Sequence, residues 1–239
     1  MVSIIITRWA ALALVLAASG SGCGLVDTNV ADFNLDLPEK QFTVDASTWN
    51  VNSSAATTFL TTSCAQMPML CGQAAASVCK AASCTGTCDA SSKTCVLQLG
   101  VSIYNTIDLV TEKPELKTIN EQPVIKVSID RVTYSVRANT LNVDSPAMTI
   151  YVAPATVMLG SDAQAKAIGT IPVVPAGTTV PATEIMFSET GRAELIAAMS
   201  NFKVPFNIIV GSTLQVNSAS MIPAGKLESG IQITAHAGL

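Results

Sequence analysis

The chain has 239 residues, of which 49% are hydrophobic, 13% are charged and 5% are aromatic. This apolar fraction is enough for one sizeable core, and its combination with a formal net charge of −4 argues against a disordered chain. Lysine and arginine never form a run, so the sequence lacks the basic footprint that phosphate binding requires, and we expect no nucleic acid among its partners.

Residues 1–22 have the pattern of an export signal. Arg8 supplies one positive charge, an apolar stretch follows over 9–18, and small residues occupy 19–22. The apolar stretch is shorter than the roughly 20 residues that a membrane-spanning helix needs. The pattern predicts a secretory signal. An uncleaved anchor, or an ordinary signal cleaved after a small residue, is the alternative.

Cys23 directly follows these small residues in the segment SGSGC. The segment resembles the lipobox of bacterial lipoproteins, with Gly20 standing where the common form has leucine. The resemblance implies that 1–22 is a lipoprotein signal peptide. It also implies that the Cys23 thiol receives a diacylglycerol, and that cleavage before Cys23 frees an amine that is then acylated. Gly24 in place of aspartate implies an outer-membrane location, with residues 23–31 as a tether to the lipid bilayer.

Hydrophobic residues alternate with polar ones at the start of 32–63, which predicts N-terminal strands. Phe33, Leu35 and Leu37 share one phase, Pro38 interrupts it, and an alternating pair resumes at Phe42.

Six of the seven cysteines lie within 64–95, and this clustering predicts a small disulfide-stapled module: Cys64, Cys71, Cys79, Cys84, Cys88 and Cys95. Lipidation of Cys23 leaves an even number, as a disulfide framework in an oxidising compartment requires. Six cysteines allow many pairings, and the sequence does not choose among them. A zinc site is the alternative, although zinc ligands usually come in closely spaced pairs. Within the module we expect one or two short helices, followed by a turn-rich loop from Cys84 to Cys95.

Alternating segments separated by turn signals recur over 96–239, which predicts an antiparallel, immunoglobulin-like β-sandwich. The clearest strand signal is VIKVSIDRVTYSVRAN, where the hydrophobic phase slips by one residue at Asp130–Arg131. Because a β-bulge inserts one residue and flips the phase, the slip predicts a bulge there. One short helix is expected near 189–202, with Ser188 as N-cap and with Leu195, Met199 and Phe202 on one buried face. The fold class is therefore mainly β, with a small, disulfide-rich and partly helical insert.

The stretch from about 124 to 239 is similar to the β-sandwich of the late-embryogenesis-abundant/WHy type. The carrying segments are VTYSVRANTLNVDSPAMTIYVAP, GTIPVVPAGTTVP and VPFNIIVGSTLQV. The whole layout resembles uncharacterised bacterial lipoproteins that combine a Cys-rich insert with such a domain. The resemblance brings no catalytic residue to transfer.

Few residues have the chemistry of a catalytic centre. His236, the single histidine, lies on the last expected strand, where an exposed structural position is the preferred interpretation. Trp49 is expected to anchor the core or a sheet edge. Two groups of carboxylates lie close in sequence: Asp36, Glu39 and Asp45, and Asp108, Glu112 and Glu115.

These observations favour a non-enzymatic lipoprotein of the bacterial cell envelope, with no cofactor or metal. We expect a structural or binding role with an envelope protein or a glycan as partner. One alternative is a glycan hydrolase that uses two carboxylates. The other is an accessory lipoprotein that binds a hydrophobic ligand between its sheets.

Overall fold

The computed structural model describes residues 33–118 and 126–238. The expected signal peptide 1–22, the tether 23–31 and Cys23 lie outside these residues. Among the residues described, no helix is long and apolar enough to cross a membrane.

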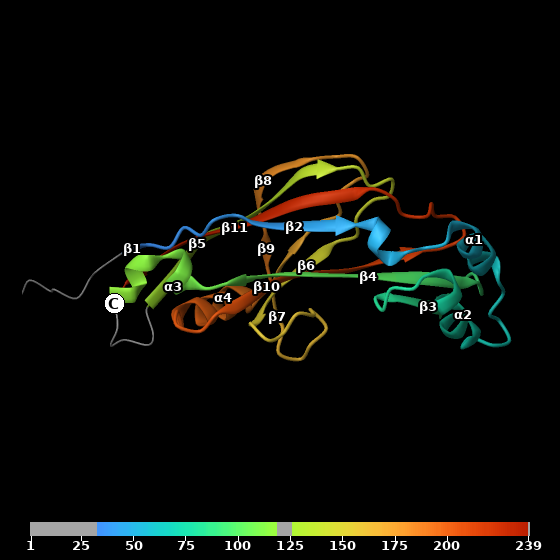
Figure 1. The fold of residues 1–239 in the computed structure, drawn as a ribbon, viewed down its shortest axis with the longest axis horizontal. Coiled ribbons are helices and arrows are strands. Elements are labelled where there is room, and N and C mark those ends of the chain that lie inside the picture. The colour runs from blue at the N-terminus through green and yellow to red at the C-terminus, as the bar shows by residue number, and fades with distance from the viewer. Residues whose placement is uncertain (1–32, 119–125, 239) are drawn as a thin grey trace, which may run out of the picture. The chain divides into compact units, whose positions relative to one another are not determined.

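Two antiparallel sheets form the body of the structure (Figure 1). In the first sheet, β11 (Lys226–Gly238) and β5 (Lys126–Asn139) are central. One side of β11 pairs with β1 (Phe33–Asn34) and β2 (Lys40–Asp45), and β5 pairs at its other side with β8 (Val180–Glu184). The second sheet has the order β3 (Cys84–Cys88), β4 (Cys95–Ile107), β10 (Phe206–Val216), β6 (Met148–Pro154), β7 (Lys166–Ile171) and β9 (Met186–Phe187).

Side chains from both sheets meet in one hydrophobic core. Phe42, Ile129 and Ile231 of the first sheet belong to the same buried cluster as Leu97 and Ile208 of the second. Burial of apolar area on this scale is the main force that holds two sheets face to face. The predicted mainly-β, antiparallel sandwich is therefore confirmed.

The expected β-bulge is present in β5. Arg131 pairs with Thr234 of β11, the next pair joins Ile129 to Ala235, and Asp130 between them has no opposite residue. Ile129 and Val132 are both buried on either side of the slip. The extra residue thus keeps both halves of the strand facing the core.

The segment 32–63 contains helices as well as the predicted strands. After β2, the chain forms the 3₁₀-helix η1 (Ala46–Trp49) and the helix α1 (Ser53–Thr61). The Asp45 side chain accepts a hydrogen bond from the Ser47 N–H, and the Asn52 side chain accepts one from the Ala55 N–H. These N-caps satisfy backbone donors that a helix start leaves free, which is why strand structure stops at residue 45.

The predicted helix near 189–202 is α4 (Gly191–Ser200). Leu195, Met199 and Phe202 are buried, as expected. Its N-cap is Thr190 and not Ser188, because the Ser188 hydroxyl instead donates to the carbonyl oxygen of Ala167. Two further short helices were not predicted: α3 (Leu109–Glu112), which the Asp108 carboxylate caps, and η2 (Pro114–Thr118).

The cysteine-rich segment is built into the second sheet. Its helix α2 (Leu70–Val78) was expected, but 84–95 is a β-hairpin and not a turn-rich loop, because β3 pairs with the start of β4. Helices α1 and α2 lie together at this end of the sandwich (Figure 1). A Cβ placed on Gly86 of β3 would lie 2.2 Å from the carbonyl oxygen of Cys71, so glycine allows α2 to pack directly on the strand.

The substitution Gly86→Ala should therefore lower the free energy of unfolding by about 1–3 kcal/mol, because α2 has to move away from β3. The matched control is Gly72→Ala on α2, where a Cβ would lie 3.6 Å from the Gly86 carbonyl oxygen. Alanine there should leave stability unchanged or raise it by up to about 1 kcal/mol through helix propensity. Denaturant unfolding without reductant measures both. Equal destabilisation by the two variants would contradict the close packing.

Candidate functional site

All six cysteines of 64–95 are paired, and the structure supplies the connectivity that the sequence leaves open. The disulfides are Cys64–Cys88, Cys71–Cys95 and Cys79–Cys84, with Cα–Cα distances of 5.9, 5.4 and 6.2 Å. Cys71–Cys95 joins α2 to the first residue of β4. Cys79–Cys84 links the end of α2 to the start of β3. Together these bridges attach the helices to the hairpin.

Two of the bridges are neighbours, because Cys88 and Cys95 are opposite each other in the β3–β4 ladder. The sulfurs of Cys64, Cys71 and Cys95 consequently lie within 4.8 Å of one another. This is the only group of three potential metal ligands of this kind within residues 33–118 and 126–238. Zinc binds thiolates, whereas these sulfur atoms are bonded to other sulfur atoms, so the disulfides and a zinc site exclude each other.

His236 is half-exposed on β11, as expected. Its Nδ1 lies 2.9 Å from Oδ1 of Asp130, the extra residue of the β-bulge. The bulge thus directs the carboxylate toward the histidine of the neighbouring strand.

Most of the carboxylates in the two groups are engaged by different partners. Asp36 accepts a hydrogen bond from Asn34, and Glu112 pairs with Lys40 at 2.5 Å. Asp108 caps α3 by accepting hydrogen bonds from backbone N–H groups. Glu115 lies on η2. Each of the other two, Glu39 and Asp45, lines a different depression of the surface.

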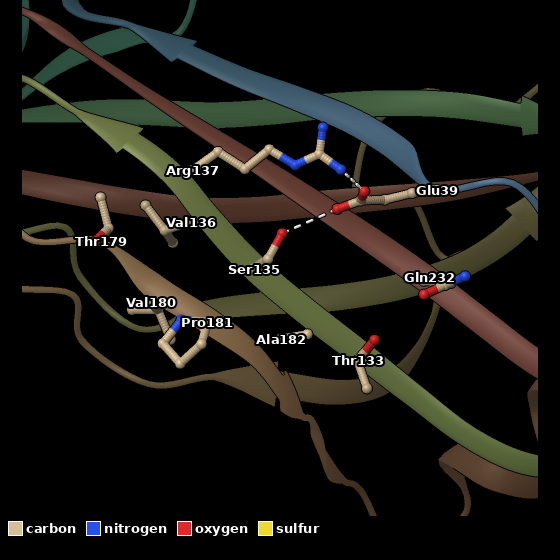
Figure 2. A pocket seen from close by; sticks show the side chains of 10 residues that line it. All are labelled: Glu39, Thr133, Ser135, Val136, Arg137, Thr179, Val180, Pro181, Ala182 and Gln232. Carbon is tan, nitrogen blue, oxygen red and sulfur yellow. Dashed lines mark hydrogen bonds and ion pairs between the residues drawn. The ribbon is translucent and has the colours of Figure 1, made fainter.

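Glu39 lies in a shallow depression of about 500 Å³ on the outer face of the first sheet (Figure 2). Its side chain crosses β11 at Gly230, where a Cβ would collide with the carboxylate. Oε2 forms an ion pair with Arg137, and Oε1 accepts a 2.9 Å hydrogen bond from the Ser135 hydroxyl. Both partners belong to β5, so the contacts fasten the β1–β2 connection to the sheet. The Ser135 hydroxyl therefore donates to the Glu39 carboxylate, whose charge Arg137 neutralises.

A larger groove of about 1100 Å³ lies between β2 and β4. Its lining comes from β2, η1, the turn before β3, the middle of β4, and adjoining parts of β6, β10 and the loop after β6. Trp49 forms part of the wall but is only 4% exposed, and its indole N–H donates to the Gly100 carbonyl oxygen at 3.1 Å. The expected role of Trp49 as a core anchor is confirmed. The ring of Tyr151 packs close to Gly211 and Gly160, where a Cβ would come within 3.1 and 2.6 Å of it.

The groove carries little net charge. Asp45 is the one aspartate, glutamate, lysine, arginine or histidine among the described lining residues, and it forms a 2.8 Å ion pair with Lys226. The hydrogen bond from Lys226, followed by those from Ser47, lowers the pKa of Asp45 to about 2. The carboxylate therefore stays ionised and paired at neutral pH. The remaining polar groups in the lining are mostly serine and threonine hydroxyls.

Sequence reasoning missed this groove, because it depends on how distant strands lie together. One signal was present: Gly100 and Gly211 interrupt otherwise regular strand segments. Glycine inside a strand often marks a close approach of other backbone or a ligand. Gly100 has this role, since its N–H donates to the Ser83 carbonyl oxygen at 2.7 Å.

Comparison with known proteins adds no relative, because no family model matches the chain and no curated protein matches it either.

Removing a disulfide should destabilise the fold according to the length of chain that it closes. The variant Cys71→Ala/Cys95→Ala opens a bridge with a sequence separation of 24 and should lose about 3 kcal/mol of unfolding free energy. The variant Cys79→Ala/Cys84→Ala opens one with a separation of 5 and should lose about 2 kcal/mol. Denaturant unfolding of both variants without reductant gives the order. The reverse order, or no loss in either variant, would contradict the assigned bridges.

Proposed function

We propose that this chain is an exported, lipid-anchored protein of the bacterial cell envelope, held at the outer membrane through Cys23, with a binding role. The observation that carries the proposal is the complete pairing of the other six cysteines. Disulfides persist in oxidising compartments outside the cytosol, which agrees with an export signal over 1–22. Pairing also leaves Cys23 as the one cysteine available for acylation.

Lipidation gives such a chain a stable attachment without a spanning helix. One acyl chain binds a bilayer only marginally, whereas two or three anchor a protein firmly, since each buried CH₂ contributes about 0.8 kcal/mol. The anchor leaves the sandwich outside the hydrocarbon, with its surface free for a partner.

The groove between β2 and β4 supports a binding role for the sandwich. A carboxylate-based glycan hydrolase needs two carboxyl groups about 5–10 Å apart across a cleft. Among the lining residues that the structure describes, Asp45 is the only carboxylate, and it is committed to Lys226 and to the cap of η1. The proposal therefore assigns the groove to a partner and not to hydrolysis.

The proposal is tested by following acylation of Cys23. Cells that express the chain are labelled with an alkyne-bearing fatty acid, and the purified protein is examined for label and for intact mass. We expect the wild-type protein to carry the label and to begin at residue 23. Cys23→Ser should lose the label and keep residues 1–22, because the modified sulfur is absent.

The matched control is Cys79→Ala/Cys84→Ala, which removes two other cysteines and should keep the label. A wild-type protein without label, or label that persists in Cys23→Ser, would refute lipidation at this position.

A further inference from the structure

Strand β4 is paired along most of one edge but along less than half of the other. Along one side it pairs with β10 from Leu97 to Ile107. Along the other side β3 pairs with it only from Cys95 to Leu99. Beyond that point β4 continues without a neighbouring strand in the described structure on this side, and residues 100–103 of the open part line the groove.

The backbone groups that face the open edge follow from Gly100. Its N–H donates to Ser83 and its carbonyl accepts from Trp49, so both of its backbone groups point away from β10. In an antiparallel strand every second residue repeats this orientation. The N–H and C=O groups of Ser102 and Tyr104 therefore face the open edge. Neither residue's backbone groups have a hydrogen-bond partner within 33–118 and 126–238.

Across the groove, β2 presents a second open edge. The Gln41 carbonyl oxygen accepts a 2.8 Å hydrogen bond from the Asn105 side chain, which places the backbone groups of Gln41 on the side facing β4. The same alternation places those of Thr43 on that side. Thr43 also lines the groove. The hydrogen bond between Asn105 and Gln41 and the one between Gly100 and Ser83 mark the two limits of the unpaired stretch of β4.

We propose that this groove binds an extended, uncharged segment of another polypeptide, which adds as a strand to the open edge of β4. The inference names the partner for the binding role proposed above and rests on that role. Unpaired N–H and C=O groups that repeat every second residue match the repeat of an extended peptide backbone. Val101 and Ile103, which are half-buried at this edge, offer apolar surface to alternate side chains of the peptide.

The low charge of the groove lining favours an uncharged peptide over a charged one. Asp45 is neutralised by Lys226, so a charged segment gains no ion pair and loses hydration in the groove. A segment that alternates β-branched residues with serine or threonine fits both the apolar and the hydroxyl-bearing parts of the lining.

The proposal is tested with a random-hexapeptide display library, selected on the purified full chain in detergent. We expect enrichment of uncharged peptides with alternating β-branched residues. One enriched peptide is then labelled with fluorescein, and its affinity is measured by anisotropy for the wild type, Ser102→Pro and Ser102→Ala. Proline removes the outward N–H without touching a hydrogen bond to β10, and edge strands tolerate it. Ser102→Pro should weaken binding at least about tenfold.

Ser102→Ala is the matched control, because it removes the hydroxyl that contacts the loop after β6 but keeps the N–H. It should bind at least about fivefold more tightly than Ser102→Pro, because the backbone N–H that the peptide needs is intact. A peptide methylated on every backbone nitrogen should not bind the wild type, which tests the hydrogen bonds without altering the protein.

No enriched peptide, equal affinity for Ser102→Pro, or binding of the methylated peptide would overturn the proposal. Retention of a chitin oligosaccharide in the absence of any enriched peptide would overturn it too, and would assign the groove to glycans. Peptide binding by Cys23→Ser is measured in parallel, so failure of the lipid anchor and failure of the strand site are read separately.

Discussion

Strand β4 is bonded to the disulfide-linked helices at its start and is paired in the second sheet along most of its length. Its first residue, Cys95, is bonded to Cys71 of α2 and pairs with Cys88 of β3. From Leu97 onward the same strand pairs with β10 in the centre of the second sheet. One continuous strand is thus bonded to α2 at its start. The same strand contributes several buried side chains to the core, including those of Leu97, Leu99 and Ile107. The cysteine-rich segment is an extension of the sandwich and not a separate module.

The same arrangement creates the groove. Cys79–Cys84 ties the start of β3 to the end of α2, and α2 packs closely on the middle of β3 at Gly86. β4 is more than twice as long, so its second half extends past β3 and leaves an edge uncovered. Natural sheets usually protect such edges with charge, proline or a covering element. Neither Ser102 nor Tyr104 is charged or a proline, and no described strand pairs with their outward backbone groups, as the proposed strand addition requires.

Local patterns in the sequence predict the strands, the bulge at Asp130 and the buried face of α4, because each depends on the spacing of neighbouring residues. The N-caps Asp45 and Asn52 were visible as residue types, but the strand alternation before them drew the interpretation toward β-structure. The disulfide connectivity and the groove depend on contacts between distant segments, such as Trp49 with Gly100 and Asn105 with Gln41. Such pairings follow from the assembled sheets and leave no periodic signal in the chain.

Amide hydrogen exchange along β4 distinguishes an open strand edge from a covered one. The N–H groups of Val101 and Ile103 face β10 and should exchange slowly, whereas those of Ser102 and Tyr104 should exchange close to the rate of an unstructured peptide. This alternation is the signature of a strand that is paired on one edge and open on the other. Slow exchange at all four residues would show that the edge is already covered, and fast exchange at all four would show that β4 is not paired with β10 as described.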